Sequence, residues 1–542
     1  MFVAGGGANS LRAEAPQDAK IAVTGVVSDA EGPIIGASVT EAGNPGNGTA
    51  TDVEGKYSLR VSPNATIAVA YLGYSTQEVP VNGQTTINVA LTADASNLDE
   101  VVVIGYGTQK RAELTSAIGS ASGKVLENRP IATIGEGLQG VIPNLQIVPG
   151  GTAPGQGASF NIRGYTSLSG GGPLILVDGV VQDPNLVNPN DIESVSVLKD
   201  AASSAIYGAR AAYGVILFTT KSGKKNQKPT FNFSSSWAES APINLQHTMS
   251  ALDYVNIMNM SSHNSGSGDI FDARQVGYIK AYNDDPVNNL PVYYDPTVET
   301  DGKYGYSGNT DWADVLYKNG GQQQYNISMS GGSESTRYFM SYGFLEQQGI
   351  LAAYDDSYQR HTINLDLTTD VNKWLTLGAK AKYTYGYEDH PSGGMSQSGL
   401  SATGGVLKGD LPPFMPIRHP DGNYAGQGSI TNPFAIGDLA GYDQRKVNDL
   451  WITGKLTLHP LTGLNVNADF TFNPYSYNRE RVVKRFMEKH ADGGENVYPW
   501  VRDDGVTRYN NNDYYTAINV YTDYTKSIDK NNFWYRRLGR PC

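Results

Sequence analysis

Three stretches of the sequence decide the fold class: LDEVVVIGYGTQKR at residues 98–111, NIRGYTSLSGGGPLILVDGV at 161–180 and DIESVSVLKDAASSAIYGARAAYGVILFTTKSG at 191–223. The first contains four consecutive β-branched residues between polar and glycine-rich flanks, which favours a short extended segment. The other two combine strand-like runs with one alanine-rich segment and predict a compact α/β unit. This unit precedes a long array of alternating strands.

From about residue 230 the side chains follow a two-residue period. The segment LTLGAKAKYTYGY at 375–387 alternates apolar or aromatic residues with Thr, Gly and Lys. Strands of this kind reach the roughly 9–11 residues that a tilted strand needs to cross a bilayer, with charges facing a wet interior. Tyr383, Tyr385 and Tyr387 fall on the outward face, as expected for an interfacial aromatic girdle.

The connections between these strands also alternate. Short turns near 331–335, 370–373 and 460–463 separate long polar links at 239–321, 388–446 and 478–512. Outer-membrane barrels have short periplasmic turns and long extracellular loops. A soluble antiparallel sheet shares the side-chain alternation but has no reason for this pattern of links. About eight strands are expected, starting near residues 230, 323, 336, 360, 374, 447, 464 and 514.

The N-terminal part reads as a small all-β domain between residues 21 and 91. Strand-like runs are divided there by Gly, Pro and Asn turns at regular spacing. The stretches VTGVVSDAEGPIIGASV at 23–39 and TATDVEGKYSLRV at 49–61 resemble the carboxypeptidase-regulatory-like extension of many SusC-type proteins. In that family the extension carries no catalytic residues, so the resemblance implies a spacer or binding module.

The order of these parts resembles the SusC/RagA type of TonB-dependent outer-membrane transporters, which have an energy-coupling segment, a plug and a barrel. The resemblance covers nearly the whole chain. It implies that residues 100–104 are the TonB box, an extended segment that a periplasmic partner grips as an added strand. Those partner-binding residues are Glu100, Val101, Val102, Val103 and Ile104.

The resemblance also assigns structural motifs of the plug, of which Arg163 and Asp178 are expected to anchor it through buried polar bonds. The motif residues are Arg163, Gly164, Asp178, Gly179, Lys199, Asp200, Tyr207 and Gly208. The segment KDAASSAIYGARAAYGVI at 199–216 predicts a short helix, an alanine-rich turn and a strand. It departs from the family at Tyr213, where Asn is usual, which puts the local packing in doubt.

The expected fold is mainly β: a small N-terminal β-sandwich, an α/β plug and the first eight or so strands of an antiparallel transmembrane β-barrel. The expected organisation is a partial signal peptide at 1–15 with cleavage after Ala15, the sandwich at 20–93, the TonB-box segment at 98–111, the plug at 112–226, the partial barrel at 229–530 and an aberrant tail at 531–542. Because barrels of this family have about 22 strands, the chain is expected to be an N-terminal fragment. A frameshift is the expected origin of the tail, which abandons the alternation.

Composition and motifs narrow the function classes. A net charge of −12 argues against nucleic acid as a partner, and no apolar run is long enough for a transmembrane helix. Cys542 is the sole cysteine, so neither an internal disulfide nor a cysteine metal site is expected. The seven histidines lack ligand spacing, and the G-x-G-x-x-G match at 135–140 lacks the strand and acidic residue of a dinucleotide site. No metal, cofactor or enzymatic activity is expected.

The function implied by the resemblance is TonB-dependent import of a nutrient across the outer membrane of a Gram-negative bacterium, with a SusD-like surface lipoprotein as partner. The family generally imports oligosaccharides and sometimes peptides. The aromatic loop residues Tyr424, Phe434 and Tyr442 suit sugar stacking but equally suit loop anchoring. Alternatives are a peptide importer, a TonB-dependent signal-relaying receptor and, from another class, a soluble β-domain protein for binding or adhesion.

Overall fold

The computed structural model describes residues 20–29, 32–42, 44–71, 74, 76–91, 101–104, 107–110, 118–127, 129–162, 164, 171–245, 247–294, 304–392, 411–420, 422–426, 432–489, 495–497, 503–528 and 531–538. The chain forms two compact units, Met1–Thr115 and Ser116–Cys542. Among the described residues, no helix is both long enough and apolar enough to cross a membrane.

The first unit contains a β-sandwich of a three-stranded sheet, in the order β4-β1-β7, and a four-stranded sheet, in the order β3-β2-β5-β6. Its strands are β1 (Ile21–Ser28), β2 (Ser38–Glu41), β3 (Asn44–Ala50), β4 (Lys56–Val61), β5 (Thr66–Ala70), β6 (Gln77–Pro80) and β7 (Val89–Ala90). Every second residue of β4 is buried, and Val23, Val39 and Ile67 belong to the core between the sheets. This architecture confirms the predicted sandwich.

The second unit begins with an α/β part, which we call the plug. Its five-stranded sheet has the order β10-β15-β16-β13-β14, and β11 and β12 form a separate hairpin. Its elements are β10 (Ile118–Ser122), η2 (Gly123–Val125), α2 (Ile134–Leu138), β11 (Leu145–Pro149), β12 (Ala158–Ile162), β13 (Leu174–Val177), β14 (Val180–Val181), η3 (Pro184–Leu186), η4 (Pro189–Asp191), β15 (Ile192–Leu198), α3 (Ala201–Ser204), η5 (Ala205–Ala211) and β16 (Val215–Thr220).

The plug core packs α2 against the sheet and the hairpin. Ile134 and Leu138 of α2 are fully buried with Val195, Val197 and other residues of the same core. A Cβ at position 137 would lie 2.4 Å from Leu126 Cδ2 and 2.5 Å from Ile131 Cδ1, so a larger residue would displace these core side chains. Close packing therefore explains this glycine of the G-x-G-x-x-G match.

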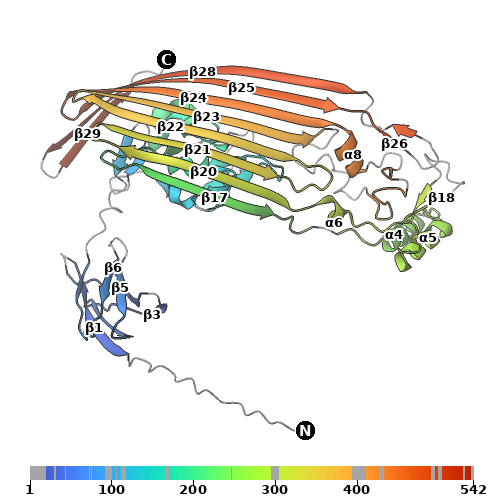
Figure 1. Cartoon of the computed structure of the whole chain (residues 1–542), viewed down its shortest axis with the longest axis horizontal. Coiled ribbons are helices and arrows are strands. Elements are labelled where there is room, and N and C mark those ends of the chain that lie inside the picture. Colours follow the sequence, from blue (N-terminus) through green and yellow to red (C-terminus); the bar gives the residue numbers. More distant parts are fainter. Residues whose placement is uncertain are drawn as a thin grey trace, which may run out of the picture. The chain divides into compact units, whose positions relative to one another are not determined.

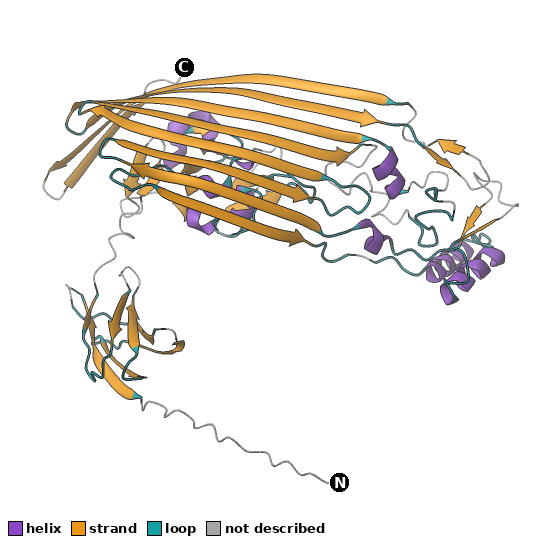
Figure 2. Cartoon of the chain, viewed as in Figure 1, coloured by secondary structure: helices purple, strands orange, loops and turns teal. Residues whose placement is uncertain are grey.

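The largest element is one antiparallel sheet of nine strands, in the order β17-β20-β21-β22-β23-β24-β25-β28-β29. Figures 1 and 2 show its long strands side by side, with the plug against one face. We call the face that contacts the plug the inner face. The strands are β17 (Thr230–Ser240), β20 (Gly320–Gly332), β21 (Thr336–Gln348), β22 (Ser357–Asn372), β23 (Leu375–Pro391), β24 (Tyr442–Leu461), β25 (Leu464–Val483), β28 (Gly505–Ile528) and β29 (Asn531–Leu538).

The two faces of this sheet differ as predicted. On the outer face Leu365, Leu367 and Phe470 expose apolar side chains, whereas on the inner face Asp366 and Thr471 are polar and buried. This inversion of the usual soluble pattern, with the plug covering polar groups, supports a partial barrel whose outer face meets an apolar environment.

The connections confirm the alternation of short and long links. Three tight turns follow β20, β22 and β24, and long links follow β17, β23 and β25, whereas the link after β21 is short and comprises residues 349–356. The long links hold α4 (Ala251–Asn264), α5 (Ala273–Asp284), β18 (Val292–Tyr294), β19 (Tyr304–Tyr306), α6 (Trp312–Leu316), α8 (Pro433–Leu439), β26 (Met487–Lys489) and β27 (Glu495–Val497). In Figure 1 the labelled elements of these links lie beyond the same end of the sheet, which we call the long-link end.

The expected starts of two strands are wrong. The strands expected to start near residues 447 and 514 begin earlier, at Tyr442 and Gly505. Charged side chains extend the pairing there, since Arg479 Nη2 contacts Asp443 Oδ2 at 2.6 Å and Arg508 Nε contacts Glu480 Oε2 at 2.6 Å. Residues 531–538, expected to lie in an aberrant tail, form β29 and pair with β28. Backbone hydrogen bonds make such a pair whether or not the side chains alternate.

Candidate functional site

The turn that joins β13 to β14 brings the plug into contact with charged side chains of the sheet. Asp178 and Gly179 form this two-residue turn with φ of 51° and 89°, as a type I′ hairpin turn requires. The Asp178 carboxylate accepts hydrogen bonds from Thr220 N at 2.9 Å and Thr220 Oγ1 at 2.7 Å. These bonds, from the end of β16, fix the carboxylate toward the sheet.

On the inner face of β23, two lysines meet this carboxylate. Lys382 Nζ forms a close ion pair with Asp178 Oδ2, and Lys380 Nζ lies 3.5 Å from the same oxygen. Lys380 Nζ also lies 2.8 Å from Asp366 Oδ2, across the strand pair. We call Asp178, Asp366, Lys380 and Lys382 the ionic cluster; all four side chains are largely buried, and their formal charges cancel.

The electrostatics of the ionic cluster favour an ionised Asp178. Burial by itself raises the pKa of this carboxyl, but the ammonium groups of Lys380 and Lys382 outweigh burial and hold the pKa well below its ordinary value of 3.8. The carboxylate therefore stays charged at physiological pH and anchors the plug to the sheet.

Further polar contacts lie toward the long-link end. Arg360, on the inner face of β22, donates from Nη1 to Asn185 O at 2.9 Å and from Nη2 to Ala132 O at 2.8 Å. Thr384 Oγ1 on β23 donates to Leu186 O at 3.0 Å. These side chains satisfy backbone carbonyls of the plug, so the sheet and the plug share their hydrogen bonds.

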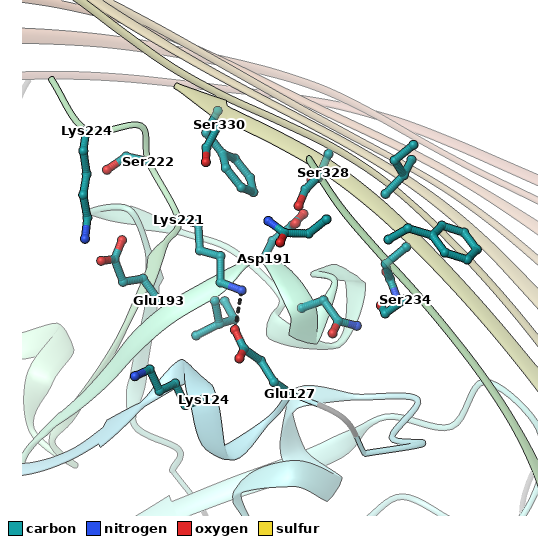
Figure 3. Close-up of a pocket in the computed structure, with 18 of the residues that line it drawn as sticks. Lys124, Glu127, Asp191, Glu193, Lys221, Ser222, Lys224, Ser234, Ser328 and Ser330 are labelled. Carbon is teal, nitrogen blue, oxygen red and sulfur yellow. Dashed lines mark hydrogen bonds and ion pairs between the residues drawn. The ribbon is translucent and has the colours of Figure 1, made fainter. Parts of the chain in front are cut away.

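The contact with β20 and β21 is different, because a cavity of about 520 Å³ separates plug and sheet there. Figure 3 shows Lys124, Glu127 and Lys221 on the plug side, with Ser328 and Ser330 on the sheet side. Lys221 Nζ and Glu127 Oε1 form an ion pair of 2.6 Å within the plug. The cavity is thus lined by hydroxyl groups and by charges of both signs.

Asp191 also lines this cavity. It is buried at the junction of η4 and β15, and burial raises its pKa to about 6. In contrast to Asp178, this carboxyl has no ion pair with the sheet among the described residues.

The comparisons with known proteins agree with this architecture. Residues 110–215 match the TonB-dependent receptor plug domain, and residues 23–103 match the CarboxypepD_reg-like domain. The chain is 29% identical over 546 residues to TonB-dependent receptor SusC of Bacteroides thetaiotaomicron, covering 95% of this chain and 49% of that protein. The structure of the RagAB peptide importer in the open-open state superposes with a TM-score of 0.63 and 25% identity, covering 80% of this chain and 47% of that one.

The chain belongs to the SusC/RagA-type TonB-dependent receptors. It is also 32% identical over 471 residues to TonB-dependent receptor P39 of Formosa agariphila, covering 84% of this chain and 40% of that protein. The chain therefore spans about two fifths to one half of the length of these relatives.

The predicted TonB box of this SusC/RagA-type chain lies in the first unit. Val101, Val102, Val103 and Ile104 form β8 (Val101–Ile104), which pairs antiparallel with β9 (Gly107–Lys110) in a sheet of only these two strands. One edge of β8 therefore has no strand partner among the described residues. Glu100, the cleavage residue Ala15 and the motif residue Arg163 lie outside the described residues.

The other predicted plug motifs have structural positions within the plug. Lys199 Nζ donates to Pro143 O at 2.5 Å, and the Asp200 carboxylate caps α3 by accepting from Ser203 N at 2.6 Å. Gly164 and Gly208 have φ of 80° and 65°, which L-residues rarely adopt. Tyr207 lies in η5 beside this turn. Among the predicted motif residues that the structure describes, Asp178 is the one that forms ion pairs with the nine-stranded sheet, through Lys380 and Lys382.

Sequence reasoning placed Lys380 and Lys382 on the inner face but gave no signal that they meet Asp178. Arg360 was missed, although its position in the alternation of β22 is an available signal. The histidine spacing in the sequence also gives no sign of the contacts of His247, whose Nδ1 lies 2.8 Å from Asp311 Oδ2 and 3.4 Å from Asp314 Oδ1. A hydrogen bond with Asp311 raises the pKa of His247. Asp311 caps α6, so this exposed group stabilises the start of that helix.

Two of the aromatic loop residues are anchors. Tyr424 is buried with Ile436 and Phe486, and its hydroxyl donates to Asp438 Oδ2 at 2.9 Å. Phe434 packs against the same cluster. Of the two interpretations that the sequence left open, the structure favours loop anchoring for this pair. Tyr442 begins β24 and donates from its hydroxyl to Glu480 Oε1 at 2.9 Å.

Proposed function

We propose that this chain belongs to a TonB-dependent importer of a nutrient, with oligosaccharides as the first candidate cargo, in the outer membrane of a Gram-negative bacterium. The observation that carries the proposal is the plug seated on the polar inner face through the ionic cluster, while the outer face of the same sheet exposes apolar side chains. A plugged barrel needs this arrangement and a soluble adhesion protein does not.

The energy-coupling step would act through β8. This strand pairs with β9 over four residues only, and an isolated two-stranded pair is marginally stable in water. A periplasmic partner such as TonB could therefore add a strand to β8 or replace β9 at low cost. Traction on β8 would then reach the plug that follows it in the chain.

Inner-face aromatic residues support a sugar as cargo. Trp451 and Tyr515 lie on the inner face with ring centroids 5.6 Å apart, and Tyr477 and Tyr509 lie farther along it with centroids 6.0 Å apart. Aromatic rings beside polar groups suit the apolar faces and hydroxyl edges of sugars. A peptide is the second candidate, supported by the likeness to the RagAB peptide importer.

A SusD-like surface lipoprotein is the proposed partner at the long-link end. Large apolar side chains are exposed there, including Met260 on α4 at 59%, Val287 at 88% and Leu290 at 66%. Exposed apolar side chains of this size indicate contact with another protein.

The test deletes residues 100–104 from the protein as its native host produces it. Uptake of radiolabelled oligosaccharides should be lost, while binding of the same oligosaccharides at the cell surface should persist. A comparison of Val102→Pro with Val102→Thr is more specific than the deletion. Proline removes a backbone hydrogen-bond donor, whereas threonine keeps the preference for an extended backbone. Undiminished import by the deletion or by the proline variant would refute the coupling role.

Fractionation separates the alternative classes. An importer should be found in the outer-membrane fraction with heat-modifiable migration, whereas an adhesion protein without a barrel would be recovered in soluble form. A signal-relaying receptor would instead change transcription without importing its ligand.

A further inference from the structure

The plug meets the sheet through two regions of opposite character. On β22 and β23 it is held by the ionic cluster. On β20 and β21 it faces the cavity of about 520 Å³. The difference between the two regions affects where a passage opens when the plug is displaced. The inference that follows rests on the proposed import function.

The sheet side of the cavity region contains buried polar atoms without partners. Ser341 on β21 is 8% exposed and Asn364 on β22 is 3% exposed, and the two residues pair directly across the strands. Within the described residues, Ser341 Oγ and both polar atoms of the Asn364 amide lack a hydrogen-bond partner. The Asp191 carboxylate of the plug faces these two side chains, and their polar groups partly offset the rise that burial causes in its pKa.

Buried polar groups are almost always satisfied by protein or by water. The cavity beside these atoms is polar and large enough for several water molecules. Water in the cavity would complete the hydrogen bonding of Ser341 and Asp191, which both line it, and would hydrate the two surfaces before the plug moves.

Few direct bonds cross to β20 and β21. Asn188 Nδ2 donates to Asn326 Oδ1 at 2.8 Å, Gln322 Nε2 donates to Pro130 O at 3.1 Å, and Gly155 N donates to Gln347 Oε1 at 3.0 Å. All three are bonds between neutral groups, which water replaces at little net cost.

Separation at the ionic cluster is far less favourable. Lys382 has Asp178 as its sole ion-pair partner among the described side chains. Withdrawal of Asp178 would leave this buried ammonium group uncompensated, which is strongly unfavourable. Force on the plug should therefore separate it from β20 and β21 first, while the turn at Asp178 and Gly179 stays bound.

We infer that the cavity between the plug and β20–β21 is the starting point of the solute passage, which opens along these strands while the ionic cluster remains closed. Its lining suits an uncharged hydrophilic solute. Six serines supply hydroxyl groups, and three lysines face three acidic residues, so the lining offers hydrogen bonds with a balanced charge.

Cysteine labelling in living cells tests the position of this passage. Two variants, Ser341→Cys and Thr453→Cys, are each made in the protein as its native host produces it, in a background in which Cys542 and any other native cysteine are replaced by serine. Ser341 lines the cavity, whereas Thr453 lies beside Lys380 and Lys382. The two residues are a matched pair, since both carry a hydroxyl group on the inner face and are 8% and 9% exposed.

The probe is fluorescein-5-maleimide, added to energised cells and to cells treated with a protonophore. Energisation should increase the labelling rate of Ser341→Cys several-fold and leave that of Thr453→Cys unchanged. An equal increase at both positions, an increase confined to Thr453→Cys, or no increase at either position would overturn the inference. Because import is measured separately, a cell that imports oligosaccharides without added labelling at position 341 refutes the location of the passage and not the import function.

Discussion

The ionic cluster should dominate the attachment of the plug, and Asp178→Asn tests this directly. The substitution keeps the shape of the side chain and removes its charge. Asp178 accepts two hydrogen bonds from Thr220 and pairs with Lys382, which has no second ion-pair partner among the described side chains. Lys380 keeps Asp366 at 2.8 Å. Asp178→Asn should therefore reduce the free energy that holds the plug on the sheet by about 3–5 kcal/mol, because one buried ion pair is lost and the ammonium group of Lys382 is left without a partner.

Hydrogen exchange of the backbone amides in β13 and β14 measures this loss. These amides are paired within the plug's own sheet and exchange when the plug opens, so a loss of about 3–5 kcal/mol in the opening free energy of the plug should speed exchange by roughly two to three and a half powers of ten. The matched control is Asp183→Asn, an exposed Asp of the plug that caps η3 by accepting from Asn185 N at 2.9 Å. Asn also caps helices well, so the control should exchange almost as the original protein does.

A double-mutant cycle identifies the partner. Asp178→Asn combined with Lys382→Met removes both charges. The double variant should lose less stability than the two single variants together, because it leaves no buried ammonium group without a partner. Equal exchange rates in Asp178→Asn and the control, or strictly additive costs in the cycle, would refute the role of the ionic cluster. Since the pKa of Asp178 is lowered, its contribution should be full above pH 3.8 and decline only below that value.

Two further predictions concern the cavity. Ser341→Ala should change the stability of the plug by no more than about 0.5 kcal/mol, because Ser341 Oγ has no hydrogen-bond partner of normal geometry among the described residues. Pulse proteolysis in urea measures this stability, and a loss near that of Asp178→Asn would contradict the prediction. Asp191 has a folded-state pKa of about 6 against an ordinary 3.8, so the folded plug binds the proton more tightly and gains stability as the pH falls from about 6 to about 4, by up to about 1.4 kcal/mol per pH unit. Asp191→Asn should stabilise the plug at pH 7 and abolish this dependence, and an unchanged pH profile in the same proteolysis assay would contradict the assignment.

The sequence predicted the parts of the fold that depend on local patterns. Alternation at residues 375–387 placed Lys380 and Lys382 on the face opposite Tyr383, and the structure has them there because β-strands project side chains to alternate faces. The sandwich and the alternation of short and long links followed from turn residues and spacing in the same way. The family resemblance singled out Asp178, which no local pattern did.

The contacts between distant segments could not be predicted. Asp178 and Lys382 are 204 positions apart in the sequence, and their pairing depends on how the plug sits on the sheet. The unpartnered Ser341 and Asn364 look like ordinary inner-face residues in the sequence, since a missing partner is visible only in three dimensions. Strand ends were misplaced for a related reason: the pairing of Asp443 with Arg479 extends strands into segments whose polarity predicts loops.

The account depends most on the claim that one face of the nine-stranded sheet meets lipid and the other encloses the plug. Nitroxide labels placed one at a time along β23, from Leu375 to Tyr387, test it in outer-membrane vesicles by collision with oxygen, which concentrates in lipid, and with a water-soluble nickel chelate. The account predicts a two-residue period, with Leu377, Ala379 and Ala381 accessible to oxygen and Lys380 and Lys382 shielded from it. Access of the nickel chelate to the Leu377, Ala379 and Ala381 positions, without any period, would contradict it.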